Sequence, residues 1–164
     1  MKKFFFLSMM SLVTLMMHAQ SESQDYVDLG LPSGTLWQNS ENGSYTYYKA
    51  IEEFGDKLPT KEQYEELMDK CEWIYIQYAY VGVYRVTGPN GNSIELIAPQ
   101  KGESGDGYLY YEGGYWTRNL APDNNNWAFI INFIGYPHTK KRYWINCCAS
   151  KTDKYWGVRL VKSK

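Results

Sequence analysis

The segment Lys57–Cys71, KLPTKEQYEELMDKC, carries the clearest local signal in the chain. Leu58-Pro59 predicts an extended approach, because proline disfavours helical geometry in the residue before it. Thr60 can then accept from the first unpaired backbone N–H groups, and Gln63 completes a capping box. Apolar side chains follow at helical spacing, at Tyr64, Leu67, Met68 and Cys71. We therefore expect a helix here that packs one side on a core.

The N-terminal end has the pattern of a secretory signal peptide. Two lysines precede an apolar run at 4–17, and Ala19 supplies a small residue where a signal peptidase would cut. We expect residues 1–19 to be removed and residues 20–164 to form one domain; the alternative is a buried N-terminal helix. The run is shorter than the ~20 apolar residues that a transmembrane helix needs, and no later stretch approaches that length. No membrane span is therefore predicted.

Composition favours strands and tight turns. The chain has 16 Tyr, 6 Trp and 14 Gly, which suits a β-rich fold better than a helical bundle. The aromatic residues either fill a β-rich core or equip a surface for binding. Removal of the two N-terminal lysines leaves a small negative net charge, so no nucleic-acid partner is expected.

A second helix is predicted on the N-terminal side of the first. Ser44 is its expected cap and Gly55 its left-handed terminal residue. Its apolar positions recur at helical spacing, at Tyr47, Ile51 and Phe54. Two short strands are predicted before it, on either side of a Pro-Ser-Gly turn, at Tyr26–Leu31 and Thr35–Trp37.

Short strands and polar loops make up the rest of the chain. The predicted strands are Trp73–Tyr80, Gly82–Thr87, Ile94–Leu96, Tyr108–Tyr111, Tyr115–Thr117, Trp127–Phe133, Tyr143–Cys147 and Tyr155–Val161. A strong turn signal at 88–92 makes the second and third of them a hairpin. The predicted loops are Gln100–Gly107, Pro122–Asn126 and Tyr136–Arg142. Two early helices followed by short strands and long loops predict an α+β fold.

Five motifs together resemble the Fibrobacter succinogenes major paralogous domain family. They are YVDLGLPSGTLW at 26–37, KLPTKEQYEELMDKCEW at 57–73, VTGPNGNSIEL at 86–96, GYWT at 114–117 and GVRLV at 157–161. Members are secreted bacterial proteins, abundant in gut Bacteroidetes. The family looks like a branch of the C-type lectin-like fold, which also includes formylglycine-generating sulfatase-modifying enzymes.

The resemblance covers nearly the whole chain after the signal segment. It implies a single C-type lectin-like domain, with two helices flanking a twisted antiparallel sheet and long loops. The terminal strands are expected to pair near Tyr26–Leu31 and Gly157–Val161. Arg159 is then expected to pair with a carboxylate or a carbonyl, because an unpaired buried guanidinium would be costly. The implied location is outside the cytoplasm of a Gram-negative bacterium: secreted, periplasmic or at the cell surface.

The sequence departs from the family's patterns at three points. Family members usually carry an insertion with a Cys after the Leu-Trp motif, which is missing here and with it the family's partner for Cys71. Calcium-dependent lectins use Glu-Pro-Asn and Trp-Asn-Asp triplets, where this chain has Gly88-Pro89-Asn90 and Asn126-Trp127-Ala128. The vicinal Cys147-Cys148 pair does not match the reactive cysteines of formylglycine-generating enzymes. Neither of these activities is therefore expected.

The three cysteines leave two alternatives open. An exported protein meets oxidising conditions, so Cys71 is expected to bridge to Cys147 or Cys148 and to leave one thiol over. The alternative is three free buried thiols, since an odd count and a vicinal pair are unusual for a disulfide framework.

No catalytic or metal constellation emerges from the residue types. The only histidine after the signal segment is His138, in a predicted loop, which argues against Ser-His-acid and Cys/His metal sites. Glu103, Asp106 and residues 123–126 could offer oxygens to calcium, but they match no ordered loop of alternating ligands. Lys140-Lys141-Arg142 could bind an anion or form a solvated loop. We expect no metal and no cofactor.

The C-type lectin-like fold implies a ligand face built by loops of the second half. Those loops are Gln100–Gly107, Arg118–Asn126, Tyr136–Arg142 and Ala149–Asp153. The expected contact residues are Trp116, Asn125, Asn126, Tyr143 and Trp144. The aromatics would stack on a sugar ring or anchor a protein partner, and the amides would orient it.

These observations favour a non-enzymatic binding or adhesion module that recognises a glycan or a surface protein. One alternative is a secreted glycan hydrolase, if the carboxylates of Glu95, Glu103 and Glu112 converge in space. Another is a structural piece of a surface assembly that packs on its neighbours through aromatic strands.

Overall fold

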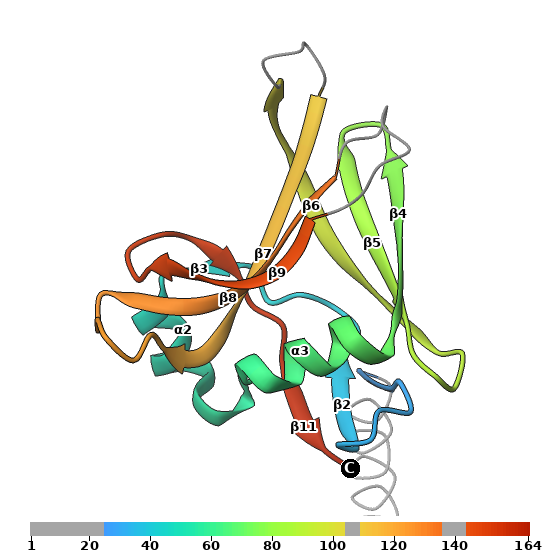
Figure 1. The fold of residues 1–164 in the computed structure, drawn as a ribbon, viewed down its shortest axis with the longest axis horizontal. Helices are drawn as coiled ribbons and strands as arrows, with labels where there is room; N and C mark the ends of the chain where they lie inside the picture. Colours follow the sequence, from blue (N-terminus) through green and yellow to red (C-terminus); the bar gives the residue numbers. More distant parts are fainter. Residues whose placement is uncertain (1–24, 104–108, 136–143) are drawn as a thin grey trace, which may run out of the picture.

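The computed structural model describes residues 25–103, 109–135 and 144–164 (Figure 1). This part of the chain is mainly β-sheet with two α-helices, α2 (Tyr47–Phe54) and α3 (Lys61–Lys70), and is therefore an α+β fold, as predicted. The expected signal segment lies outside the described residues. None of the helices within those ranges is long and apolar enough to cross a membrane.

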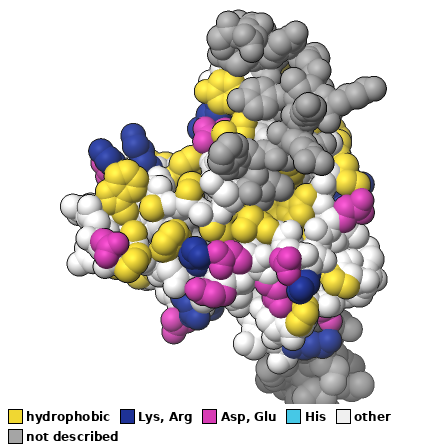
Figure 2. Space-filling model, viewed as in Figure 1, with side chains coloured by type: hydrophobic (Ala, Val, Ile, Leu, Met, Phe, Trp, Pro, Cys, Tyr) yellow, Lys and Arg dark blue, Asp and Glu magenta, His cyan; other side chains and the backbone are white. Residues whose placement is uncertain are grey.

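Helix α3 forms as its sequence predicts. Thr60 Oγ1 accepts from the Gln63 backbone N at 3.1 Å, and the Thr60 backbone N donates to Gln63 Oε1 at 2.8 Å, so both halves of the capping box are present. Tyr64 and Leu67 are fully buried where α3 packs on the large sheet. The opposite side of the helix carries acidic and basic side chains at the surface (Figure 2).

Helix α2 begins two residues later than predicted. Its N-cap is Thr46, in an extended conformation and without a side-chain cap, whereas Ser44 lies in strand β3 (Ser44–Tyr45). The reason is tertiary: β3 pairs with β10 (Trp156–Gly157), a contact from more than a hundred residues away that local spacing does not reveal. Gly55 ends α2 and is the first residue of the short η1 turn (Gly55–Lys57). Its φ of 51° is positive, as expected, but its ψ of −123° lies outside the left-handed helical region.

A small sheet joins the two ends of the chain. It consists of β1 (Tyr26–Asp28), β2 (Thr35–Gln38) and β11 (Val161–Ser163) in the order β1-β2-β11, and Trp37 pairs with Val27 on one side and Val161 on the other. The terminal strands therefore share a sheet, but the predicted direct pairing between them is wrong. β2 lies between the two terminal strands and pairs with both of them.

The large sheet has eight strands. Its main path is β3-β10-β7-β6-β5-β4, with β8 paired to β7 and β9 paired to β8. The bounds are β4 Glu72–Tyr78, β5 Val81–Thr87, β6 Ser93–Glu103, β7 Leu109–Leu120, β8 Trp127–Gly135 and β9 Trp144–Lys151. The predicted hairpin turn at 88–92 is present between β5 and β6, with Gly91 at a φ of 85°. In Figure 1, β4 to β7 rise as a tall twisted layer, and β8 and β9 run beside β7 above α3.

Strand β7 is continuous where the sequence predicts two short strands. The gap between the two predicted strands includes Gly113-Gly114, but both residues lie inside β7. Their missing Cβ atoms leave space for aromatic rings that pack on the strand. A Cβ on Gly113 would lie 2.3 Å from Cε2 of Phe133, and one on Gly114 would lie 2.7 Å from Cε3 of Trp156. Glycine inside a strand thus marks close packing here and not a turn.

The predicted terminal strand 155–161 is split between the two sheets. β10 belongs to the large sheet and β11 to the small one, and Arg159 lies in the crossing segment between them, fully buried. Two apolar clusters form on the two faces of β7, β8 and β9. The first contains Trp37, Tyr64 and Phe133, and the second, under α2, contains Trp116 and Tyr47.

Candidate functional site

Trp116 is not a ligand contact in this structure. Its side chain is fully buried in the second cluster, its Nε1 donates to the Tyr45 carbonyl at 2.8 Å, and its ring packs edge-on against Tyr47 with centroids 5.4 Å apart. Strand alternation points Trp116 to the side of the sheet that α2 covers. That prediction is wrong, and the residue belongs to the core.

The other predicted contact residues fall into two groups. Asn125 and Asn126 are exposed in the β7–β8 connection, as expected of ligand contacts. Tyr143 and the side chain of Trp144 lie outside what the structure describes. The predicted contact residues are therefore not seen together in one site.

Two of the predicted ligand loops do meet. The Thr152 backbone N donates to the Asn126 carbonyl at 2.9 Å, which brings the β7–β8 and β9–β10 connections side by side. A cavity of about 310 Å³ lies there, lined by Asn124, Asn126, Trp127, Lys151, Thr152 and Asp153. Parts of both predicted loops are strand instead, because β7 extends to Leu120 and β9 to Lys151.

All three cysteines are free, and the predicted bridge from Cys71 is not formed. Cys147 Sγ lies 4.0 Å from the Lys61 carbonyl at the start of α3, whereas Cys71 caps the end of that helix. Ten helical residues rise about 15 Å, and a disulfide needs Cα atoms within about 7 Å. Cys148, next in β9, packs on the opposite cluster. Burial raises the pKa of the Cys71 thiol to about 11 and that of Cys147 to about 12, so both thiols stay protonated at neutral pH.

A second candidate site lies where β6 parts from β7. The two strands pair from Gln100 with Tyr111 to Glu103 with Leu109, with a bulge at Gln100/Gly102, and then diverge: β6 continues against β5, and β7 continues between β8 and β10. Along the parted stretch, side chains take over the role of the missing strand partner. The Ile97 backbone N donates to Tyr115 Oη at 2.9 Å, and the Glu95 carbonyl accepts from Arg159 Nη2.

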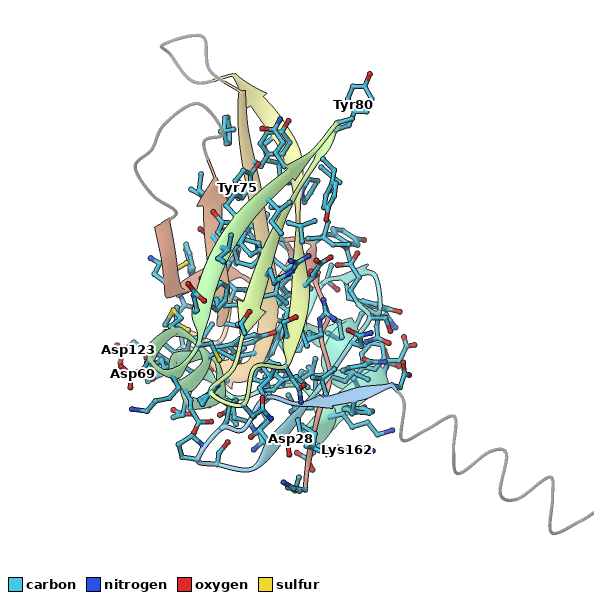
Figure 3. All side chains as sticks on the ribbon, turned by 90° about the vertical axis from the view of Figure 1, so that its right-hand side faces the viewer. Asp28, Asp69, Tyr75, Tyr80, Asp123 and Lys162 are labelled. Atoms are coloured by element: carbon cyan, nitrogen blue, oxygen red, sulfur yellow. The ribbon has the colours of Figure 1, made fainter. Side chains whose placement is uncertain are left out.

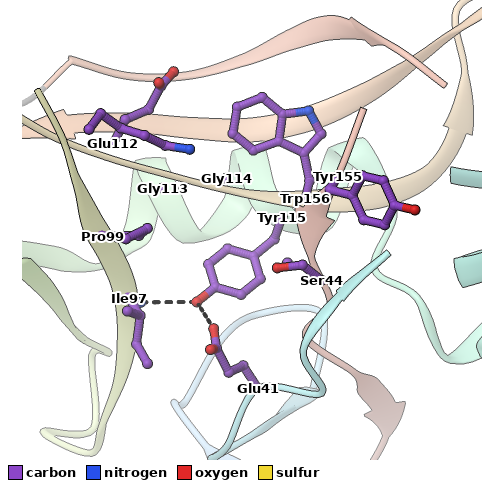
Figure 4. A pocket seen from close by; sticks show the side chains of 12 residues that line it. Glu41, Ser44, Ile97, Pro99, Glu112, Gly113, Gly114, Tyr115, Tyr155 and Trp156 are labelled. Carbon is purple, nitrogen blue, oxygen red and sulfur yellow. Dashed lines mark hydrogen bonds between the residues drawn. The ribbon is translucent and has the colours of Figure 1, made fainter. Parts of the chain in front are cut away.

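Tyr115 connects this gap to the surface. Its hydroxyl accepts from Ile97 and donates to Glu41 Oε2 at 2.8 Å (Figure 4). Burial raises the pKa of Tyr115, so the hydroxyl stays protonated and remains a donor to the carboxylate. The segment that carries Glu41 is thereby held against the sheet.

Arg159 is held by carbonyl oxygens, as predicted. Its Nη1 donates to the carbonyls of Gln38, at 2.9 Å, and of Asn39, and its Nη2 donates to that of Glu95. These bonds fasten the end of β2 to β6 behind the site. The guanidinium also lies over the Tyr115 ring, 5.7 Å from its centroid.

A pocket of about 220 Å³ opens in front of these residues. We call it the Gly113–Gly114 pocket. Its other lining residues are Glu41, Ser44, Ile97, Pro99, Lys101, Glu112, Tyr115, Tyr155, Trp156 and Gly157. Figure 4 shows Glu41 and Glu112 on opposite sides of it, with Trp156 and Tyr155 beside the Tyr115 ring.

The glycines shape the pocket. Because Gly114 has no Cβ, the Trp156 ring lies directly on the β7 backbone, and its Nε1 donates to Ser150 Oγ at 2.8 Å. Gly157 likewise makes room for Tyr115, since a Cβ there would be 2.7 Å from Cδ1 of that ring. The indole is thus fixed in place, while Tyr155 next to it is 70% exposed.

Of the carboxylates considered for the alternative hydrolase, the two that are described, Glu95 and Glu112, do not share a site. Glu112 lines the pocket and accepts from Asn132 Nδ2 at 3.1 Å, whereas Glu95 is bound to Arg85 Nη2 at 2.9 Å, and the Glu103 side chain is not described. Glu41 replaces them as the second acid of the pocket. Neither Glu41 nor Glu112 takes part in any ion pair of the described residues.

Metal-binding clusters of His, Cys, Asp or Glu are absent from the part of the chain that the structure describes. The calcium ligands considered from sequence are only partly within it, because Asp106 lies outside. His138 and the Lys140–Arg142 segment also lie outside.

Sequence reasoning missed Glu41, Ser44, Tyr155 and Trp156 as pocket residues. Glu41 and Ser44 precede the second predicted helix, of which Ser44 is the expected cap. Tyr155 and Trp156 lie in the predicted strand Tyr155–Val161. The usable signal was glycine: Gly113-Gly114 and Gly157 each sit beside aromatic residues, where close packing of a ring on backbone is possible.

No family model matches this chain, and no curated protein or solved structure matches it either.

Proposed function

We propose that this chain is an exported, non-enzymatic binding module that holds a glycan in the Gly113–Gly114 pocket. We further propose that it is a C-type lectin-like domain of the Fibrobacter succinogenes major paralogous domain family, acting in the periplasm, at the surface or outside of a Gram-negative cell. The support for the family and the location is the motif order and the N-terminal pattern of the sequence.

The observation that carries the binding proposal is the fixed Trp156 ring beside oxygen-bearing side chains. Sugar rings present apolar C–H faces that stack on aromatic rings, and hydroxyls that bond to carboxylates and hydroxyl groups. The pocket offers Trp156 and Tyr155 for the first kind of contact and Glu41, Glu112 and Ser44 for the second. An indole that is already packed and hydrogen-bonded loses little freedom on binding, which favours affinity.

The charge of the pocket fits a ligand that is neutral and rich in hydroxyl groups. Glu41 and Glu112 can accept hydrogen bonds on two sides, and Lys101 can donate from the same lining. A surface protein is the alternative ligand, and the exposed Tyr155 would then anchor the contact with it.

A glycan array with the purified protein tests the proposal. We expect reproducible retention on a subset of glycans with no product released. Tyr155→Ala and Trp156→Ala should each weaken the best binding at least tenfold. Tyr80→Ala, at another exposed tyrosine, on the β4–β5 turn, is the control and should leave binding unchanged. Equal loss in all three variants, or in none, would refute the assignment.

Hydrolysis is the second candidate, because two carboxylates that form no ion pair with any described residue face each other across the pocket (Figure 4). Glycoside hydrolysis uses such a pair, one as acid and one as base or nucleophile. Incubation of each array ligand with pure protein decides: product that disappears in both Glu41→Gln and Glu112→Gln establishes an enzyme, and intact ligand after long incubation supports binding.

A further inference from the structure

Strand β4 is an outermost strand of the large sheet with an open edge. It pairs with β5 through seven consecutive residues without a bulge, and no other strand of the described ranges pairs with its far side. Folded proteins protect such edges with proline, lysine, bulges or very short strands. β4 has none of these, and its only charged residue is Glu72.

The other outermost strands differ. β3 has only two residues, and β9 lies against α3. In the small sheet, β1 and β11 have three residues each. A long, regular and nearly uncharged edge is therefore specific to β4 among the described strands.

One face of β4 is apolar and exposed. Trp73 and Tyr75 point to the first core cluster, so Ile74, Ile76 and Tyr78 point the other way. Ile74 is 44% exposed and Tyr78 is 48% exposed. The register continues the row across the sheet from Ile76 through Val83, which is only 5% exposed, to Ile97, which is 36% exposed and also lines the Gly113–Gly114 pocket. An apolar row of this kind beside an open edge is typical of an interaction surface.

We propose that the partner of this edge is a second copy of the same chain, paired antiparallel about a two-fold axis at Tyr75. In that register Ile74 lies opposite Ile76 of the second copy, which doubles the apolar row. Glu72 lies opposite Tyr78, so the two carboxylates stay at opposite ends and like charges do not meet. A two-fold contact of this kind is self-complementary and closes as a dimer.

Tyr80 at the hairpin turn does not stand in the way of this contact. Figure 3 looks at the molecule from the side of β4 and β5, where the hairpin runs up to Tyr80 at its turn. Tyr80 is 84% exposed and lies beyond the end of β4, so it does not block the strand edge. The paired edges would make one continuous antiparallel sheet from the two copies.

Sedimentation velocity of the purified chain over a hundredfold range of concentration tests the dimer. We expect a monomer–dimer equilibrium, and we expect Ile74→Lys and Ile76→Lys each to raise the dimer dissociation constant at least tenfold. Tyr48→Lys is the control, since Tyr48 is 54% exposed on α2 and away from the edge. A wild-type chain that stays monomeric, or a dimer that neither edge variant weakens, overturns the proposal.

Cross-linking tests the register and does not depend on the lysine variants. Under mild oxidation, a mixture of Ile74→Cys and Ile76→Cys chains should form a disulfide-linked dimer several times faster than either variant alone, because the register places these two positions opposite each other. The wild-type chain gives the background from its own thiols. Cross-linking that is no faster in the mixture than in the separate variants overturns the two-fold pairing at Tyr75.

Discussion

The guanidinium of Arg159 lies 5.7 Å from the centroid of the Tyr115 ring, and both side chains bond to the part of β6 that has left β7. Arg159 donates to the Glu95 carbonyl, and the Tyr115 hydroxyl accepts from the Ile97 N–H. These two side chains replace the hydrogen bonds of a neighbouring strand. A gap between strands normally costs unpaired backbone groups. Here the gap leaves space for the Gly113–Gly114 pocket, while the Glu95 carbonyl and the Ile97 N–H behind the pocket keep hydrogen-bond partners.

Arg159→Met should lower the free energy of unfolding by about 3 kcal/mol, because three carbonyls lose their donor, one in a buried bond (Gln38) and two in part-buried bonds (Asn39 and Glu95). Chemical denaturation measures this value. Arg85→Met is the control, since Arg85 makes a partly exposed ion pair with Glu95, and it should cost no more than about 1 kcal/mol. Equal effects would contradict the role assigned to Arg159.

Tyr115→Phe should cost about 1 kcal/mol, because the Ile97 N–H loses its acceptor in a part-buried bond while the ring remains. It should also weaken ligand binding, since Glu41 loses the hydroxyl that positions it. Tyr155→Phe, at an exposed tyrosine of the same pocket, gives the comparison for stability and should leave it unchanged. A Tyr115→Phe protein as stable as wild type would exclude the strand-replacing bond.

Gly114→Ala should displace the Trp156 ring, because the added Cβ would lie 2.7 Å from it. We expect a change in tryptophan fluorescence and at least a tenfold loss of ligand affinity in a protein that still folds. Gly102→Ala is matched on β6, where the nearest atom to the new Cβ is 3.5 Å away, and should change neither readout. An unchanged affinity in Gly114→Ala would remove Trp156 from the site.

The raised pKa values of two thiols predict that the folded protein loses stability at alkaline pH. The pKa values of Cys71 and Cys147 are raised in the folded state, to about 11 and about 12, from an ordinary value of 9.0. The unfolded chain therefore loses these protons first, and stability should fall as pH rises above about 9. Cys147→Ala should reduce that fall relative to wild type. A stability that rises between pH 9 and 11 would have the wrong sign.

Alkylation counts the free thiols directly. Unfolding without reductant should expose three thiols to alkylation, as the separation of Cys71 and Cys147 along α3 requires. In the folded protein at pH 8, Cys71 and Cys147 should react slowly because their thiols stay protonated. A mass that shows one alkylated cysteine and a bridge would contradict the structure.

Local signals predicted well those elements that depend on neighbouring residues. Helix α3 follows from Thr60, Gln63 and its apolar spacing, and the β5–β6 turn follows from its glycine and asparagine residues. Both are decided within a few residues. The α+β class follows from the order of these elements.

Features that depend on distant contacts were not predictable from spacing. Ser44 is a strand residue because Gly157 pairs with it, and Trp116 is buried because α2 covers its side of β7. The glycine pair in β7 falls between two predicted strands, and its place inside one strand depends on the rings of Phe133 and Trp156. The pocket combines residues from four separate segments. Of its lining residues, the sequence points to a site only through Glu112, a carboxylate of the hydrolase alternative, and through Lys101 in the predicted ligand loop Gln100–Gly107.

The central claim is that the Gly113–Gly114 pocket is the ligand site, and hydrogen–deuterium exchange with a glycan identified on the array tests it most directly. The account predicts that saturating glycan slows exchange in the segments around Glu41–Ser44, Glu112–Tyr115 and Tyr155–Gly157, and that Trp156→Ala abolishes the effect. Slowed exchange confined to the other cavity, at Asn124–Asn126 and Lys151–Asp153, with the pocket segments unchanged, would contradict it.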